Sequence, residues 1–173
     1  MQTLMWNDTD SPIAYLITFR CYGTWLHGDE RGSIDRHNNV YGALKNPPND
    51  HWKEISAARR KHMPVKLDSR RRASVERAIR QTCEIRKWAL FAVNVRTNHA
   101  HIVSSTGGRR PSVHLNAFKA NATRQIGTDG TWTFAHSPWA DRGSERWLWT
   151  EKHLSDAVEY VVNGQGGDLP RFD

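Results

Sequence analysis

The stretch WALFAVNVRTNHAHIVSS, residues 88–105, decides the fold of this chain. Residues 88–95 are rich in β-branched and aromatic side chains, as strands are, and residues 99–105 form a second strand-like run. The three residues between them, 96–98, read as a tight turn. The stretch therefore predicts a β-hairpin whose second strand begins with two histidines, His99 and His101.

Six further elements can be placed around this hairpin. We expect strands over 13–20 and 147–149, and helices over 53–63, 68–87, 111 to about 126, and 156–163. Asp68 or Ser69 can cap the long helix, Pro111 suits a first helical position, and Ser155 can cap the last helix.

The order of these elements predicts the fold class. Strands joined by a hairpin and by helices indicate an α+β protein, with an antiparallel sheet and helices on one face. A ferredoxin-like arrangement fits this order. The length suits one domain over residues 1–173, and a stretch rich in Gly, Asn, Asp and Pro predicts a long irregular insertion at about 21–67.

Composition limits the class of protein to which this chain can belong and the partners it can have. The chain has 38% hydrophobic and 25% charged residues, which is typical of a soluble globular protein. No apolar run is long enough to span a membrane, and the first residues lack a signal peptide's apolar core, so we expect a cytoplasmic protein. Its two cysteines then read as buried thiols. The net charge of +7 and the eight tryptophans favour nucleic acid as the partner.

Arginines gather on one face of the helix over 68–87. Two interpretations stay open for them: a solvated helix face, or a surface that follows the phosphates of a nucleic acid. The arginines concerned are Arg70, Arg71, Arg72, Arg77, Arg80 and Arg86.

The histidine pair allows a metal site. Residues i and i+2 of a strand point to the same face, so His99 and His101 project side by side while Ala100 turns into the core. Two such imidazoles can share a divalent cation and leave coordination positions open for a phosphate oxygen. The alternative is that both rings are ordinary polar strand residues.

A nucleophile for such a site lies on the last predicted helix. Tyr160 carries a phenol, which needs a metal-polarised phosphate or a nearby base before it can attack. Its spacing also fits an apolar helix position beside Ala157 and Val161. The residues alone leave both interpretations open.

Four motifs together resemble a known family. NHAHIVSS (98–105) resembles the His-hydrophobe-His (HUH) motif of single-strand DNA endonucleases. LNAFKANATRQI, RWLWTEKHL and AVEYVVNGQG resemble later blocks of single-tyrosine HUH transposases, of which the REP-associated tyrosine transposases are most similar because they also insert residues after the first strand. The resemblance covers most of the chain and implies the HUH endonuclease fold.

This resemblance implies a chemistry. His99 and His101 would hold Mg²⁺ or Mn²⁺, and Tyr160 would cleave single-stranded DNA, leaving a 5′-phosphotyrosine and a free 3′-OH. The family places a polar third ligand one turn after the tyrosine, where this chain has Gly164. Gln165 is the preferred substitute if the helix unwinds at that glycine, and Asn163 is the alternative.

The resemblance also implies partners. We expect hairpin-forming single-stranded DNA, a bacterial nucleoid-associated location, and a monomer or a homodimer. The residues expected to contact the DNA are Arg70, Arg71, Arg77, Arg80, Lys119 and Arg124. Two alternatives remain: a non-catalytic nucleic-acid-binding protein on the same fold, and an HUH nickase acting in replication or plasmid transfer.

Overall fold

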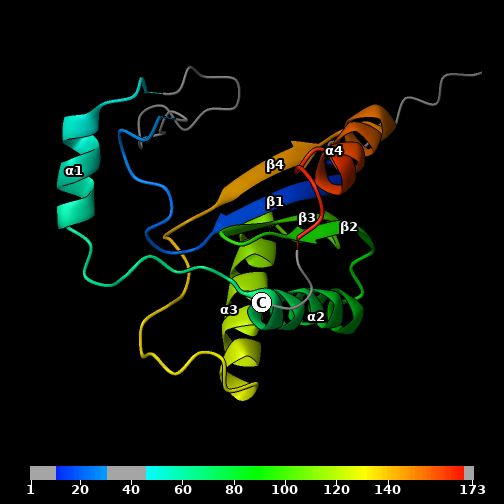
Figure 1. Cartoon of the computed structure of the whole chain (residues 1–173). Coiled ribbons are helices and arrows are strands. Elements are labelled where there is room, and N and C mark those ends of the chain that lie inside the picture. Colours follow the sequence, from blue (N-terminus) through cyan, green and yellow to red (C-terminus); the bar gives the residue numbers. More distant parts are fainter. Residues whose placement is uncertain (1–10, 31–45, 170–173) are drawn as a thin grey trace, which may run out of the picture.

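A four-stranded sheet organises the computed structural model, which describes residues 11–30 and 46–169. The strands are β1 (Ala14–Arg20), β2 (Leu90–Val95), β3 (His99–Ser105) and β4 (Ser144–Leu148), and they lie in the order β2-β3-β1-β4 (Figure 1). Every neighbouring pair is antiparallel. The predicted hairpin is therefore present, as β2 and β3.

Two helices make the connections that this strand order needs. The chain passes from β1 to β2 through α2 (Ser69–Arg86), and from β3 to β4 through α3 (Pro111–Thr128). In each case the connection skips one central strand, which gives the interleaved order of a ferredoxin-like sheet. The predicted α+β class with an antiparallel sheet is confirmed.

The main core lies between the sheet and the layer of α2 and α3, drawn below the sheet in Figure 1. Alternate residues of β1, among them Ile17 and Phe19, point into this layer and meet Ile79 of α2 and Phe118 of α3. All four of these side chains are fully buried. The α2 and α3 layer therefore buries the bulky side chains of the fold.

The last helix, α4 (Glu151–Asn163), covers the other face of the sheet. Ala157 and Val161 of α4 pack against Leu16, Val103 and Leu148, which are the strand residues that alternate away from the main core. The expectation of helices on one face therefore holds for α2 and α3 but is wrong for α4. An antiparallel sheet with apolar residues on both faces needs a cover on each side.

Local hydrogen bonds decide where the helices begin and end. The side chain of Asp68 accepts from the backbone N–H of Arg71, so Asp68 is the cap of α2, as one of the two predicted options. The last helix begins five residues earlier than predicted, because Thr150 and not Ser155 accepts the capping bond, from the N–H of His153. The strand before it is also longer than the predicted 147–149.

In the described part of the segment between β1 and α2 lies one further helix, α1 (Asp50–Ala58). It starts and ends earlier than the predicted 53–63, since the Asn49 side chain caps it at Trp52. None of its residues is buried, and Figure 1 shows it standing apart from the sheet. Residues 31–45 of the expected insertion lie outside the described part of the chain.

Two smaller expectations can also be compared with the structure. Cys21 and Cys83 are both free and buried, as predicted. Among the described helices, none is long and apolar enough to cross a membrane.

Candidate active site

The two histidines of β3 face α4, side by side. Their ring centroids are 4.7 Å apart, and the ring of Tyr160 lies 5.3 Å from that of His101. All three residues belong to one chain, so a single subunit brings the predicted nucleophile to the predicted metal ligands. Strand alternation accounts for the histidines, and packing of Ala157 and Val161 on the sheet accounts for the place of Tyr160.

Hydrogen bonds orient both imidazoles. Nδ1 of His99 lies 2.6 Å from the amide oxygen Oδ1 of Asn98, which can only accept, so this nitrogen carries a proton. Nδ1 of His101 lies 2.7 Å from Oγ1 of Thr18, a hydroxyl that can donate or accept. Each ring is therefore anchored through Nδ1, which is the way metal-binding histidines are usually held by neighbouring groups.

The other ring nitrogen of His99, Nε2, faces a side-chain oxygen of Gln165. This ring nitrogen lies 3.4 Å from Oε1 of Gln165, while Nε2 of the same glutamine donates to the carbonyl of Tyr160 at 3.0 Å. In a neutral His99 the proton is on Nδ1, so two atoms with lone pairs face each other across this gap. A cation between them, or a second proton on the ring, satisfies both atoms.

His101 is buried and electrically neutral. Burial lowers its pKa to about 4, and the nearby His99 and Arg20 add to the lowering, while a hydrogen bond with Gln165 opposes it. A neutral imidazole is the form that binds a metal ion.

The chain turns back at Gly164 to bring Gln165 to the histidines. A Cβ atom at Gly164 would lie 2.7 Å from the carbonyl oxygen of Tyr160, so only glycine fits there without a shift of the backbone. Gln165 is half-buried beside His99, whereas the exposed Asn163 donates to Glu159. Of the two residues considered for a third ligand, the structure brings only Gln165 to the pair.

Tyr160 is positioned by its helix and stays accessible. Its side chain is 48% exposed. The amide of Asn94 on β2 donates to the carbonyl of Val161 at 2.9 Å, which ties this turn of α4 to the sheet. The phenol ring is thereby held against His101, and an extended substrate can still reach it.

Three residues beside the histidine pair were not predicted from the sequence. Thr18 and Arg20 lie opposite His101 and His99 in the β1–β3 register, and the Arg20 guanidinium stacks over the Trp25 ring at 3.5 Å. Asn98 holds His99. The alternation of side chains along the strand over 13–20 could have indicated Thr18 and Arg20, because besides Tyr15 they are its only polar residues.

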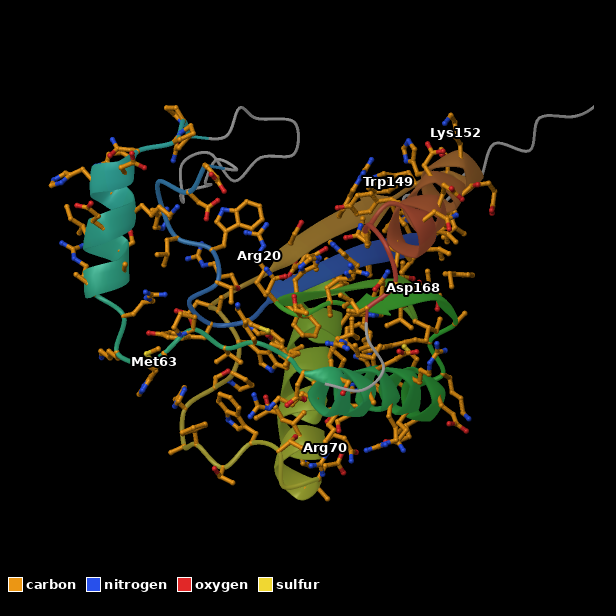
Figure 2. The ribbon with its side chains drawn as sticks, in the orientation of Figure 1. Arg20, Met63, Arg70, Trp149, Lys152 and Asp168 are labelled. Atoms are coloured by element: carbon orange, nitrogen blue, oxygen red, sulfur yellow. The ribbon has the colours of Figure 1, made fainter. Side chains whose placement is uncertain are left out.

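The residues expected to contact DNA lie on the other side of the sheet. They belong to α2 and α3, and Figure 2 shows Arg70 on that side, with Trp149 and Lys152 on the α4 side. Several already have partners in the protein. Arg77 pairs with Asp129, Arg80 pairs with Glu76, Arg71 donates to backbone carbonyls, and Arg124 donates to Asn121.

Lys119 has a structural contact as well. Its ammonium donates to the carbonyls of Ala140 and Arg142, and burial lowers its pKa, with the carboxylate of Asp141 opposing the shift. The structure thus does not bring the six predicted DNA-contacting residues to the histidine pair. Their role in DNA binding stays a prediction about a separate surface.

The described part of the chain offers no third strong ligand beside the two imidazoles. Within the described residues, no group of three His, Cys, Asp or Glu side chains could hold a metal ion. A metal at this site would therefore be bound by two histidines and the amide oxygen of Gln165.

Comparison with known proteins gives a partial similarity to a solved structure. The chain matches no family model and no curated protein. A solved structure that it resembles is a REP-associated tyrosine transposase bound to a REP hairpin, at 13% identity and a TM-score of 0.47. The similarity covers 87% of this chain, and the chain spans only 65% of that protein. The fold assignment above rests on strand order and pairing.

Proposed function

We propose that this protein cleaves and rejoins single-stranded DNA, with Tyr160 as the nucleophile and a divalent metal ion at His99 and His101. The observation that carries the proposal is the contact between the Tyr160 and His101 rings, whose centroids are 5.3 Å apart. The phenol is accessible, and it lies beside a buried neutral imidazole that is paired with a second histidine. It suits a nucleophile placed next to a metal-bound phosphate.

The donor set at this site fits a divalent cation. The lone pair of His99 Nε2 faces Oε1 of Gln165, His101 is kept neutral, and both rings are anchored through Nδ1. Two nitrogens and one amide oxygen leave positions for water and a phosphate oxygen, as Mg²⁺ and Mn²⁺ accept. When bound, the ion acts as a Lewis acid towards the scissile phosphate.

The reaction exchanges one phosphate ester for another. The phenol oxygen of Tyr160 attacks phosphorus, the bond from phosphorus to the 3′ oxygen breaks, and the DNA 5′ phosphate stays on the tyrosine. The phenol loses its proton to solvent, to which it is exposed, and the leaving 3′ oxygen takes one up. Attack by another 3′-OH reverses these steps and joins strands without an external energy source.

Charge near the site supports an anionic substrate. Arg20 lies directly opposite His99 in the sheet, and the protein as a whole carries a net charge of +7. Both features favour a polyanion such as DNA. Hairpin-forming strands are the proposed substrates, since the motifs around the histidines and the tyrosine resemble those of REP-associated transposases.

The test uses one hairpin-bearing oligonucleotide with two alternative labels and Mn²⁺. A 3′-labelled strand should become covalently attached to the protein and survive denaturing gel electrophoresis. The same strand labelled at its 5′ end should instead give a shorter free product. Tyr160→Phe should abolish the adduct, while Tyr15→Phe, which removes a phenol on the main-core face of the sheet, should keep it.

Two results would contradict the proposal. Undiminished adduct with Tyr160→Phe would exclude this nucleophile. Tight binding of the oligonucleotide with no adduct from the parent protein, over a set of hairpins and both metal ions, would favour the non-catalytic binding protein instead.

A further inference from the structure

A second concave site lies on the α2 side of the molecule. It is a cavity of about 880 Å³ between residues 61–66, which precede α2, and residues 132–136, which follow α3. Figure 2 shows Met63 on the connection between α1 and α2 that forms one wall. The volume is in the range of sites that hold a small organic group.

The walls of this cavity are aromatic. The rings of His62 and His136 stack at 3.7 Å with an angle of 6° between them, and the rings of Trp132 and Phe134 are 5.0 Å apart. Phe134 is 59% exposed although it lines the cavity. Burial and the neighbouring His62 lower the pKa of His136, which favours the neutral form of that ring. Flat, exposed ring faces of this kind suit a flat ligand.

The rim of the cavity is cationic. Lys61, Lys66 and Arg71 line it, and none of its lining residues in the described part of the chain is acidic. Arg71 is fixed in place, because its guanidinium donates to the carbonyls of Thr131 and Lys66 and lies 5.7 Å from the Trp132 ring. The ligand that matches both walls and rim is planar and anionic.

Backbone hydrogen bonds connect this cavity to the end of the sheet that carries the histidine pair. Leu67, just after the cavity wall, donates to the carbonyl of Thr97, and Val65 donates to that of Tyr22. Cys21 donates to the carbonyl of Asn98, the residue that holds His99. The cavity therefore lies at the same end of the sheet as the candidate active site, on the opposite face.

We infer that this cavity binds an unpaired nucleotide of a single strand, with the base against the aromatic wall and the phosphates along the lysines. A base supplies the flat face and a phosphodiester supplies the anion, and every base can stack in this way. The inference deepens the proposed function and rests on it for the choice of DNA as the polymer. It assigns to residues 61–66 and 132–136 the task of holding the strand at the same end of the sheet as the cleavage site.

The experiment measures binding without chemistry. Full-length protein carrying Tyr160→Phe is titrated with a fluorescent oligothymidylate and with an abasic strand of the same length. Phe134→Ala should weaken binding of oligothymidylate by about fivefold or more, because one stacked base contributes ~1–3 kcal/mol. Binding of the abasic strand should not change, since its phosphates remain and its bases are absent.

Matched variants separate stacking from folding. Phe91→Ala removes a comparably exposed phenylalanine on β2, outside the cavity, and should leave both affinities unchanged. Phe134→Tyr keeps an aromatic face and should bind as the parent does, whereas Phe134→Leu should resemble the alanine variant. Thermal melting of each variant confirms that the comparison is between folded proteins.

Three outcomes would overturn the inference. In the first, Phe134→Ala loses the same affinity for the abasic strand as for oligothymidylate. In the second, the parent protein binds duplex and single-stranded DNA equally well. In the third, thymidine monophosphate binds as tightly as the oligonucleotide. Failure here is distinct from failure of the proposed function. If the parent protein forms the adduct but Phe134→Ala binds both strands normally, only the proposed role of the cavity is rejected. If Phe134→Ala loses affinity for oligothymidylate alone but the parent protein forms no adduct, only the proposed chemistry is rejected.

Discussion

The two faces of the sheet use histidine in opposite ways. On the α2 and α3 side, His114 is fully buried, stacked on Trp88, with Nδ1 at Ser104 and Nε2 at the carbonyl of Thr106. Because a carbonyl only accepts, Nε2 carries the proton and Nδ1 accepts from the hydroxyl, so the protein satisfies both nitrogens. This histidine is a structural residue.

On the α4 side the histidines are held differently. His99 and His101 are anchored through Nδ1, and both contact the side chain of Gln165, next to an exposed tyrosine. The layer under α4 is also built of smaller residues than the main core. The comparison teaches that one face of the sheet concentrates packing, and the other gathers polar side chains beside an exposed tyrosine.

The largest expected effect is on activity. The double variant His99→Ala with His101→Ala should reduce adduct formation to background and abolish Mn²⁺ binding, because both strong ligands are gone. The variant should keep a cooperative thermal transition at a lower melting temperature, since it also removes the buried His101 ring. The control is His114→Ala, which should lower the melting temperature. Adduct formation at the parent level by the double variant would reject the metal site.

The second effect compares packing on the two faces. Phe118→Ala in the main core should lower the free energy of unfolding by about 3–5 kcal/mol. Val161→Ala under α4 should lower it by about 2 kcal/mol, since it removes fewer buried carbon atoms. Urea unfolding measures both. A larger loss for Val161→Ala would mean that the α4 layer, and not the α2 and α3 layer, dominates stability.

A third prediction concerns the residue that completes the site. Gln165→Ala should weaken Mn²⁺ binding by about tenfold or more, the range for side chains that support a metal site. Asn163→Ala should leave it unchanged, because that amide is bonded to Glu159 at the protein surface. Isothermal titration with Mn²⁺ compares the two variants. The reverse ranking would show that α4 ends differently when metal is bound.

A fourth prediction concerns the turn after α4. Gly164→Ala places a methyl group against the carbonyl of Tyr160, so the turn must shift, at a cost of roughly 1 kcal/mol, and cleavage should slow. Gly167→Ala is the matched control, because a Cβ there meets nothing within 4 Å. Equal cleavage rates for the two variants would show that the turn does not position Gln165.

The smallest expected effect is the pH dependence of stability. Burial lowers the pKa of His114 below its ordinary value of 6.5, partly offset by the Thr106 hydrogen bond, and Arg86 adds to the lowering. Below pH 6.5 the unfolded chain therefore binds a proton that the folded protein does not, and stability falls as the pH falls. Urea midpoints at pH 7 and pH 5.5 measure this loss. His114→Leu should reduce it, and an unchanged slope would assign it to other groups.

Much of the fold could be predicted from local patterns. The hairpin at 88–105, the helix capped by Asp68 and the helix opened by Pro111 all follow from side-chain alternation, helical spacing and capping residues within a few positions. The error at the start of α4 lies at an end that a competing cap decides. Thr150 caps α4 in place of Ser155, and both residue types are suitable caps, so their chemistry could not separate them.

Only part of the candidate site could be predicted from the sequence. The shared direction of His99 and His101 follows from strand geometry, and the glycines around Gln165 pointed to an unwound helix end. The supporting contacts of Thr18 and Asn94 could not be predicted from such local patterns. They depend on register and on which face α4 covers.

By itself, then, the sequence determined the elements, their order, the excess positive charge and the common direction of the two imidazoles. These follow from interactions between residues that are near one another along the chain. Only the tertiary structure decided that α4 crosses to the free face of the sheet, that Tyr160 rests against His101, and that Gln165 and not Asn163 reaches the pair. Those outcomes depend on burial of apolar surface between distant segments, which no local pattern encodes.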